Sequence, residues 1–307
     1  MNLSIQIAPT HPRGLLLKNP VMNASGTLGY VVECSQDFDI QKLGAVVCKG
    51  TTLMPWEGNP QPRLKETPCG LLNSIGLQNI GVEALIAEKA PMWATWQVPV
   101  IVNIAGERIE EYAELAAKLD GVAGVSSMEV NIGCPNVKTG GMEFGVNPNV
   151  AAEVTNAVRA ATSLPVIVKL TPNVTDIAEI ASAVAEAGAH AISLINTLKG
   201  MAIDITERKP FFINISAGLS GPAVRPTALH LVYQVAGAVD IPVIGCGGIV
   251  SAEDALEFIM AGASAIQIGT ANLVNPEAML DVLEGIERFM EKEGIKELTD
   301  LIGVAQQ

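Results

Sequence analysis

The sequence predicts an α/β fold, a (β/α)8 TIM barrel, because short strands and helices alternate along its 307 residues. Runs rich in β-branched residues recur, and Ala-rich amphipathic stretches separate most of them. Some runs, such as Pro165–Lys169, are apolar on both faces, which is typical of parallel strands covered by helices. A doubly wound open sheet is the alternative, but no Gly-x-Gly-x-x-Gly pattern follows the first strand.

Eight segments have the length and composition of barrel strands. In chain order they are Val21–Ser25, Ala45–Lys49, Val100–Ile104, Met128–Asn131, Val166–Leu170, Ala191–Ile195, Pro242–Gly245 and Ala265–Ile268. We expect them to form one parallel sheet that closes on itself.

Helices are predicted where Ala, Glu and Leu recur at helical spacing. The clearest are Ile109–Leu119, Asn149–Ala161, Asp176–Ala187, Thr227–Ala236 and Ala252–Ala261. Thr175-Asp176 and Ser251 are suitable N-caps, and Gly188 and Gly262 are suitable residues just past a helix end.

Two connections are too long for simple turns between a strand and the next helix. They are Thr51–Gly81 and Thr197–Pro226, both of irregular composition. Loops of this length inside a compact domain are usually functional. In a barrel both would be insertions over the C-terminal face, where active sites form.

Composition excludes several classes of protein. The net charge of −13 argues against nucleic acid or an anionic membrane as a partner. The five cysteines include no Cys-x-x-Cys pair and no spacing typical of an iron–sulfur cluster, so we expect a reduced, cytoplasmic protein. The three histidines lack metal-like spacing, which argues against a His-based metal site, and we expect neither a signal peptide nor a membrane-spanning run.

The C-terminal ends of the predicted strands carry mainly amides, lysines and glycines. They are Ser25, Lys49, Asn103, Asn131 with Cys134, Lys169, Asn196 with Thr197, Gly247 with Gly248, and Gly269 with Thr270. The last two pairs follow strands 7 and 8, where barrels commonly bind phosphate through backbone N–H groups. Ordinary tight turns are the other interpretation of each loop, but together they favour phosphate binding.

Cys134 lies in the run Asn131-Ile-Gly-Cys-Pro-Asn-Val-Lys138, which cannot continue a strand because of Gly133 and Pro135. A thiol between two asparagines suits a site that binds a planar, amide-rich ligand and removes a proton from it. A small buried side chain without a chemical role is the alternative. Lys49 and Lys169 each end an apolar strand, so we expect their ammonium groups in the barrel mouth.

Several motifs occur in the order found in one known family. They are Asn23-Ala-Ser-Gly26, Lys49-Gly-Thr51, Asn73-Ser-Ile-Gly-Leu77, Asn131-Ile-Gly-Cys-Pro-Asn136, Val168-Lys-Leu-Thr-Pro172, Asn196-Thr197 and Gly218-Leu-Ser-Gly-Pro222. From about Leu3 to Leu301 the chain resembles the catalytic subunit of the dihydroorotate dehydrogenases, flavin enzymes of pyrimidine synthesis.

The resemblance implies one FMN-binding barrel domain over residues 1–307. The positions that match the family's flavin site are Ser25, Lys49, Gly50, Asn103, Asn131, Lys169, Ile195, Gly221, Gly247, Gly248, Gly269 and Thr270. Those that match its dihydroorotate site are Lys49, Asn73, Ser74, Ile75, Gly76, Leu77, Asn131, Asn136, Asn196 and Thr197. Cys134 matches the catalytic base, and Lys169 would stabilise negative charge on the reduced flavin.

The resemblance also indicates a subclass. Quinone-dependent members use serine as the base and carry a hydrophobic N-terminal extension, whereas Cys134 is typical of the soluble class. The resemblance to the NAD-linked class 1B members lies in Cys134–Lys138 with Gly140-Gly141, in Leu170–Asn173 and in Gly200–Asp204. Such members pass electrons to a separate subunit with FAD and a [2Fe-2S] cluster, in a heterotetramer with two copies of each chain.

Two residues depart from the family pattern, and three alternatives stay open. Gly133 stands where serine is usual, which removes a hydroxyl beside the base and loosens the loop. Ala217 stands where glycine is usual, beside the expected flavin site, so both departures bear on rate or affinity and not on identity. The alternatives are a fumarate-linked class 1A dihydroorotate dehydrogenase that needs no partner, another FMN barrel such as dihydropyrimidine dehydrogenase, and a barrel that only binds a ligand.

Overall fold

A computed structural model of the chain describes residues 1–33, 38–133 and 144–306. Eight strands form one parallel sheet in the spatial order β3-β16-β15-β10-β9-β8-β7-β4. They are β3 (Val21–Asn23), β4 (Val46–Val47), β7 (Val100–Ile104), β8 (Ser127–Asn131), β9 (Val166–Lys169), β10 (Ala191–Leu194), β15 (Val243–Cys246) and β16 (Ala263–Ile268). A parallel bridge between Met22 and Ala45 joins the two outer strands. The sheet is therefore a closed barrel, as the sequence predicted.

The seam between β3 and β4 is also held by a side chain. Asn23 Nδ2 donates to the Val47 carbonyl at 2.7 Å, and its Oδ1 accepts from the Val47 N–H at 2.8 Å. Asn23 is completely buried, and its side chain takes the place of backbone hydrogen bonds between these two short strands.

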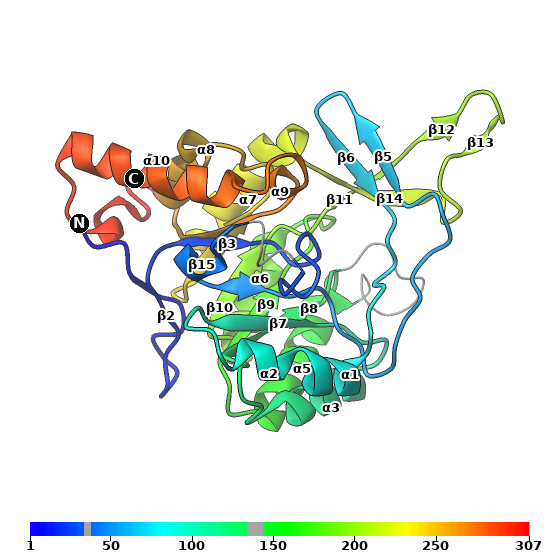
Figure 1. The fold of residues 1–307 in the computed structure, drawn as a ribbon, viewed down its shortest axis with the longest axis horizontal. Coiled ribbons are helices and arrows are strands. Elements are labelled where there is room, and N and C mark those ends of the chain that lie inside the picture. The colour runs from blue at the N-terminus through cyan, green and yellow to red at the C-terminus, as the bar shows by residue number, and fades with distance from the viewer. Residues whose placement is uncertain (34–37, 134–143, 307) are drawn as a thin grey trace.

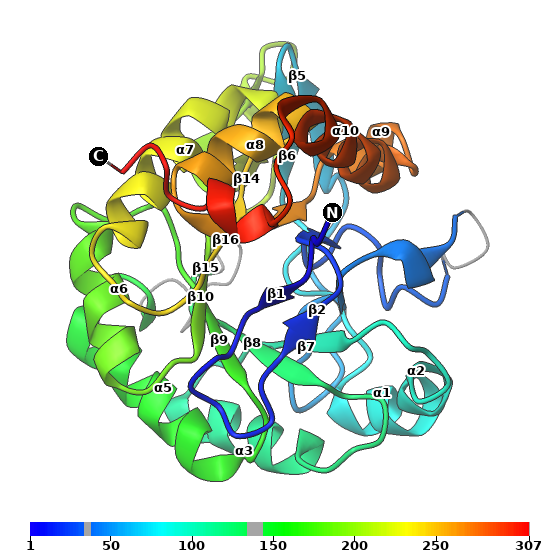
Figure 2. The ribbon, with the colours of Figure 1, turned by 90° about the vertical axis from the view of Figure 1, so that its left-hand side faces the viewer.

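Helices surround the barrel, as Figure 2 shows in a view along its axis. They are α1 (Val82–Glu88), α2 (Ala90–Trp93), α3 (Ile109–Leu119), α5 (Pro148–Ala161), α6 (Ile177–Glu186), α7 (Arg225–Ala236), α8 (Ala252–Met260), α9 (Ala271–Val274) and α10 (Ala278–Glu293), with the short 3₁₀ turns η1 (Ile40–Lys42), η2 (Pro222–Val224) and η3 (Leu298–Leu301). The predicted caps are confirmed, since the side chains of Asp176 and Ser251 accept backbone N–H groups at the starts of α6 and α8.

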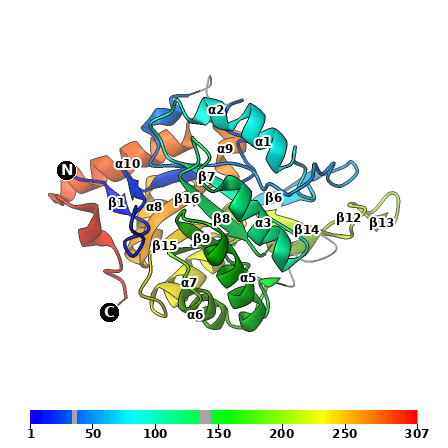
Figure 3. The same ribbon diagram turned by 90° about the horizontal axis from the view of Figure 1, so that it is seen from below.

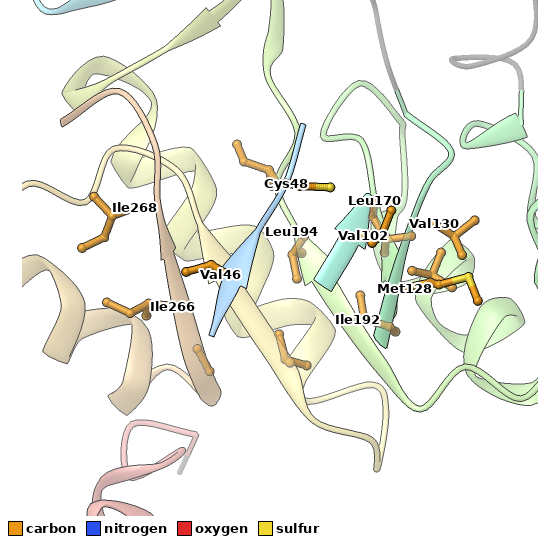
Figure 4. Packing of buried hydrophobic residues seen from close by; sticks show 14 of the residues in the cluster. Val46, Cys48, Val102, Met128, Val130, Leu170, Ile192, Leu194, Ile266 and Ile268 are labelled. Atoms are coloured by element: carbon orange, nitrogen blue, oxygen red, sulfur yellow. The ribbon is translucent and has the colours of Figure 1, made fainter. Parts of the chain in front are cut away.

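Alternate residues of each strand pack in two separate regions. One set faces the helices, and Figure 4 shows part of it, including Val102, Met128 and Val130. The other set fills the barrel interior, where Met22, Ile101 and others contact one another. This is the period-two alternation of strands that are buried on both faces.

A hairpin closes the amino-terminal end of the barrel. Its strands β1 (Ile5–Gln6) and β2 (Leu16–Leu17) pair antiparallel. Ile7 and Leu17 are completely buried against the apolar residues of the barrel interior. Figure 2 shows this hairpin lying across the opening.

A lobe of antiparallel strands covers the opposite end. Its sheet has the order β11-β14-β6-β5, and it is built from both long connections. The strands are β5 (Leu64–Thr67), β6 (Gly70–Asn73), β11 (Leu198–Met201) and β14 (Ser216–Ser220), with a further hairpin of β12 (Ile203–Asp204) and β13 (Lys209–Pro210). Figures 1 and 3 show this lobe projecting at the end away from the two termini. The connections are thus more regular than the sequence predicted.

None of the helices in the described ranges is long and apolar enough to cross a bilayer.

Candidate active site

A cavity of about 390 Å³ lies at the C-terminal end of the barrel, between the strand ends and the lobe. This volume is within the range of small-molecule and cofactor sites. Lys49 and Lys169 enter it from the barrel, whereas Leu71 and Leu219 enter it from the lobe. The long connections therefore form one wall of the site.

Most residues that the sequence singled out line this cavity. They are Ser25, Lys49, Gly50, Asn73, Ile75, Gly76, Leu77, Asn131, Lys169, Ile195, Asn196, Thr197, Gly221, Gly247, Gly248, Gly269 and Thr270. Cys134 and Asn136 lie outside the described residues. Asn103 and Ser74 are described but are not part of the lining.

Asn103 and Ser74 are both buried behind the wall. Ser74 accepts a hydrogen bond from Asn59 Nδ2 at 3.1 Å, so it braces the loop behind the cavity. Asn103 lies behind Gly50, where a Cβ atom would come 3.1 Å from Asn103 Oδ1. That oxygen is buried and has no hydrogen-bond partner within the part of the chain that is described. An unpaired buried acceptor next to a cavity indicates a missing donor.

Amide side chains form a connected group on one side of the cavity. Asn196 Nδ2 donates to Asn131 Oδ1 at 3.1 Å, and the Gly133 N–H donates to the same oxygen at 3.3 Å. Asn196 Oδ1 in turn accepts the Thr197 N–H at 2.8 Å. These bonds orient the amides, which can donate to and accept from a planar ligand without adding charge.

Lys49 brings positive charge into a half-buried position. Burial lowers the pKa of its ammonium group, and nearby Arg63 acts in the same direction, while Glu33 opposes them. The ring of Tyr30 lies 6.0 Å from Lys49 Nζ. An ammonium group that is partly stripped of water interacts strongly with an anionic ligand.

The loops after β15 and β16 approach the cavity through their backbones. Gly247 and Gly248 have φ values of +136° and +78°, which favour glycine. A Cβ atom on Gly248 would come 2.9 Å from both Arg225 N and Gly221 O. The glycine is therefore required by the close approach of this loop to the start of α7. A side chain at this position would point toward the start of α7.

The same loop is fixed by an acidic residue of α8. Asp254 Oδ2 accepts the N–H groups of Val250 and Ser251 at 2.9 and 3.1 Å, while Oδ1 accepts from Arg225. The loop is thus held before any ligand binds.

Among the lining residues that the lobe contributes, the sequence singled out Asn73 on β6 but assigned no site role to Leu71, Leu219 or Ser220. Leu71, Leu219 and Ser220 lie on β6 and β14, in segments that we expected to be irregular. Ser220 Oγ accepts from Thr270 Oγ1 at 2.8 Å and so links the lobe to the loop after β16. The sequences of these strands, Gly70-Leu-Leu-Asn73 and Ser216-Ala-Gly-Leu-Ser220, lack the alternation of apolar and polar residues that predicts a strand.

The sequence matches the family model described as dihydroorotate dehydrogenase over residues 8–290. The chain belongs to the dihydroorotate dehydrogenase family. It is similar to a protein of Geotalea daltonii, with 54% identity over 302 residues that cover 98% of this chain and 97% of the relative. It is also similar to a protein of Desulforamulus reducens, with 56% identity over 305 residues and 99% of both chains. Both relatives carry the name dihydroorotate dehydrogenase B (NAD(+)), catalytic subunit.

The two departures from the family pattern have different surroundings. A Cβ atom on Gly133 would come 2.7 Å from Thr171 Cβ, so the loop packs more closely than a serine would allow. Ala217 is buried in a small cluster with Leu72 and Phe212 inside the lobe. It is not among the residues that line the cavity of this dehydrogenase.

Proposed function

We propose that this chain is the catalytic subunit of an NAD-linked dihydroorotate dehydrogenase. It would oxidise (S)-dihydroorotate to orotate in the de novo synthesis of UMP. The observation that carries this proposal is the cavity, which brings together most of the positions that match the family's flavin and substrate sites. Relatives of more than half identity over nearly the full chain support the NAD-linked class.

The residues around the cavity fit FMN. Asn103 Oδ1 is a buried acceptor without a partner among the described residues and can take a ring N–H of a flavin. The backbones of Gly247, Gly248 and Gly269 line the other side, and α9 begins directly after Thr270. Exposed N–H groups at such turns suit a phosphate. When bound, FMN supplies the acceptor for the hydride that leaves C6 of dihydroorotate.

The chain's own residues would bind the substrate and move its proton. Lys49 offers positive charge to the carboxylate of dihydroorotate, and Asn73, Asn131 and Asn196 offer amide groups to its ring edges. Cys134, as a thiolate, would take the proton from C5. Lys169 places an ammonium group at the base of the cavity, where it would stabilise negative charge.

The electrons would leave through a second protein. We infer a partner subunit that carries FAD and a [2Fe-2S] cluster, in a cytoplasmic heterotetramer with two copies of each chain. The word "subunit" in the names of the relatives supports a partner. The net charge of −13 makes a basic docking surface on that partner suitable.

Purification of the chain alone tests the proposal. We expect a yellow protein with one FMN per chain that reduces artificial dyes with dihydroorotate but shows little NAD reduction until the partner is added. Efficient fumarate turnover without a partner would assign the chain to class 1A instead. A colourless chain that binds no added FMN would reject the flavin chemistry.

A further inference from the structure

A carboxylate is buried inside the barrel, one layer below the residues that line the cavity. Glu129 stands on β8 two residues before Asn131, so both side chains lie on the same face of the strand. Its side chain is 0% exposed. A buried carboxylate is costly unless it is paired and hydrogen-bonded, so its contacts must account for its presence.

Both oxygens of this carboxylate accept hydrogen bonds. Oε1 accepts from Asn103 Nδ2 at 2.7 Å and lies 3.6 Å from Lys169 Nζ. Oε2 accepts from Ser193 Oγ at 2.8 Å and from Gln267 Nε2 at 2.7 Å. The four partners come from four other strands of the barrel, β7, β9, β10 and β16.

These bonds determine which way the Asn103 amide faces. Its Nδ2 group is directed to Glu129, so its Oδ1 atom is left on the side of Gly50 and the cavity. That oxygen is buried and accepts no hydrogen bond from any residue that the structure describes. An amide turned the other way would place Nδ2 there and offer a donor instead.

The same bonds hold the Lys169 ammonium group. Gln267 donates through Nε2 to Glu129, which leaves its Oε1 atom to accept from Lys169 Nζ at 2.9 Å. Lys169 also has the Glu129 carboxylate as its counter-charge. Its side chain is 6% exposed and lines the cavity, so a small displacement would change what it can contact.

We propose that Glu129 is a positioning residue that fixes the Asn103 carbonyl oxygen and the Lys169 ammonium group toward the flavin. This inference rests on the proposed assignment of FMN to the cavity. Glu129 itself does not line the cavity and acts through its neighbours.

The geometry requires a carboxylate and not an amide at this position. All four partners present a donor, and a carboxylate accepts at both oxygens. Glutamine has nearly the same shape but would set its NH₂ group against one pair of donors. Either Asn103 or Gln267 would then have to turn, and Lys169 would lose its counter-charge.

The test is the affinity of the full-length apo-chain for FMN, measured by the quenching of flavin fluorescence. We expect Glu129→Gln to fold and to raise the dissociation constant of FMN by about tenfold or more, the scale of lost bonds to a charged group. If that variant does not accumulate as folded protein, Gln267→Met carries the same test, because it removes the amide that bonds both the carboxylate and the ammonium group. It should weaken FMN binding in the same direction.

A double variant separates positioning from general damage. Glu129→Gln combined with Gln267→Glu moves the carboxylate across the barrel interior from β8 to β16. It keeps a counter-charge for Lys169 and leaves the amide oxygen at position 129 free to accept from Asn103. We expect it to recover most of the affinity. The matched control is Ser193→Ala, which removes one donor to the same carboxylate but no group that faces the cavity. It should change the dissociation constant by less than about threefold.

The outcomes are distinct. Unchanged FMN affinity in Glu129→Gln, or a double variant no better than the single one, would overturn the role of Glu129 while the wild-type chain still binds FMN. A wild-type chain that binds no FMN would overturn the proposed function and this inference with it.

Discussion

Neutral amides and a few lysines, rather than clusters of opposite charges, make up the polar surface of the candidate active site. Asn131 and Asn196 are hydrogen-bonded to each other, and Lys49 is half-buried. Such a site can bind a ring with amide edges and one carboxylate without burying an unpaired charge, which would be energetically costly.

Replacement of Cys134 by Ala is expected to leave FMN bound but to slow the reduction of the flavin by dihydroorotate by about 10²-fold or more, because a general base is lost. Cys134→Ser should keep partial activity that shifts to higher pH, since a hydroxyl is a weaker acid than a thiol. Rapid-mixing absorbance measurements give the reduction rate. A rate near that of the wild type in the Ala variant would rule Cys134 out as the base.

Lys49 should make the binding of orotate depend on pH. Burial lowers its pKa below the ordinary value of 10.5, so the ammonium group loses its proton at a lower pH than an exposed lysine does. Orotate affinity should therefore fall as the pH rises, beginning below pH 10.5. Calorimetric titration with orotate at a series of pH values measures this affinity. The Cys134→Ala substitution in the titrated protein excludes any contribution from ionisation of the thiol. With Lys49→Met added, the orotate affinity should not change with pH. If it falls as it does with Lys49 present, another group causes the pH dependence.

The sequence identified some residues of the candidate site but not others. The strand-end residues were identified because barrel strands place such positions at the cavity. Glu129 was not, because it lies within a predicted strand and only its partners on other strands reveal its role. The direction of the missing Gly248 side chain likewise depends on Arg225, which the fold brings close.

Secondary-structure elements differ in how clearly the sequence specifies them. The helix Ile109–Leu119 was predicted with the bounds that α3 has, because its apolar residues recur at helical spacing. The lobe was not, because its strands have only two to five residues, are half exposed and contain Gly70, Gly200 and Gly218. Their pairing depends on contacts between segments far apart in the sequence, such as Asn73 with Gly218.

Gly218 is expected to be needed for substrate binding, because β14 passes very close to Thr197. A Cβ atom there would overlap the Thr197 hydroxyl, 2.7 Å from Thr197 Cβ and 3.2 Å from Asn73 Nδ2. Gly218→Ala should displace Thr197 and raise the KM for dihydroorotate by about tenfold, the scale of one lost hydrogen bond. Steady-state dye reduction measures it.

The control for this substitution is Gly200→Ala on the adjacent strand β11. There a Cβ atom would meet only Leu72 Cδ2 at 3.1 Å and Leu219 Cβ at 3.6 Å. A flexible leucine end can move, so the KM should stay close to that of the wild type. Equal KM values in the two variants would contradict the proposed role of Thr197.

Residues that stabilise the fold and residues that line the candidate active site lie toward opposite ends of the barrel axis. At the amino-terminal end, the β1–β2 hairpin packs Ile7 and Leu17 against the apolar interior. Toward the other end the interior becomes polar, with Glu129 and Lys169, and then opens into the cavity. Such a division is general among barrel enzymes, since loops at the C-terminal face can vary without loss of the core.

Two histidines at the amino-terminal end should make stability depend on pH without affecting the active site. The rings of His11 and His190 lie 4.7 Å apart, and His190 Nδ1 accepts the Val166 N–H at 2.9 Å. Burial lowers the pKa of His190 to about 4 from 6.5, with Arg159 and His11 adding to the effect, and burial also lowers the pKa of His11.

The unfolded chain therefore binds more protons than the folded chain between pH 6.5 and about 4. Above pH 6.5, His190 is neutral in both states and costs the fold nothing. As the pH falls from 6.5 to about 4, protonation of the unfolded chain lowers the free energy of unfolding by an amount of the order of 2 kcal/mol. Urea denaturation at a series of pH values should show this decline. His190→Asn keeps an acceptor for Val166 and should flatten the profile, whereas the same change at the exposed His230 should not alter it. Equal slopes in wild type and His190→Asn would mean that carboxylates alone account for the loss of stability in acid.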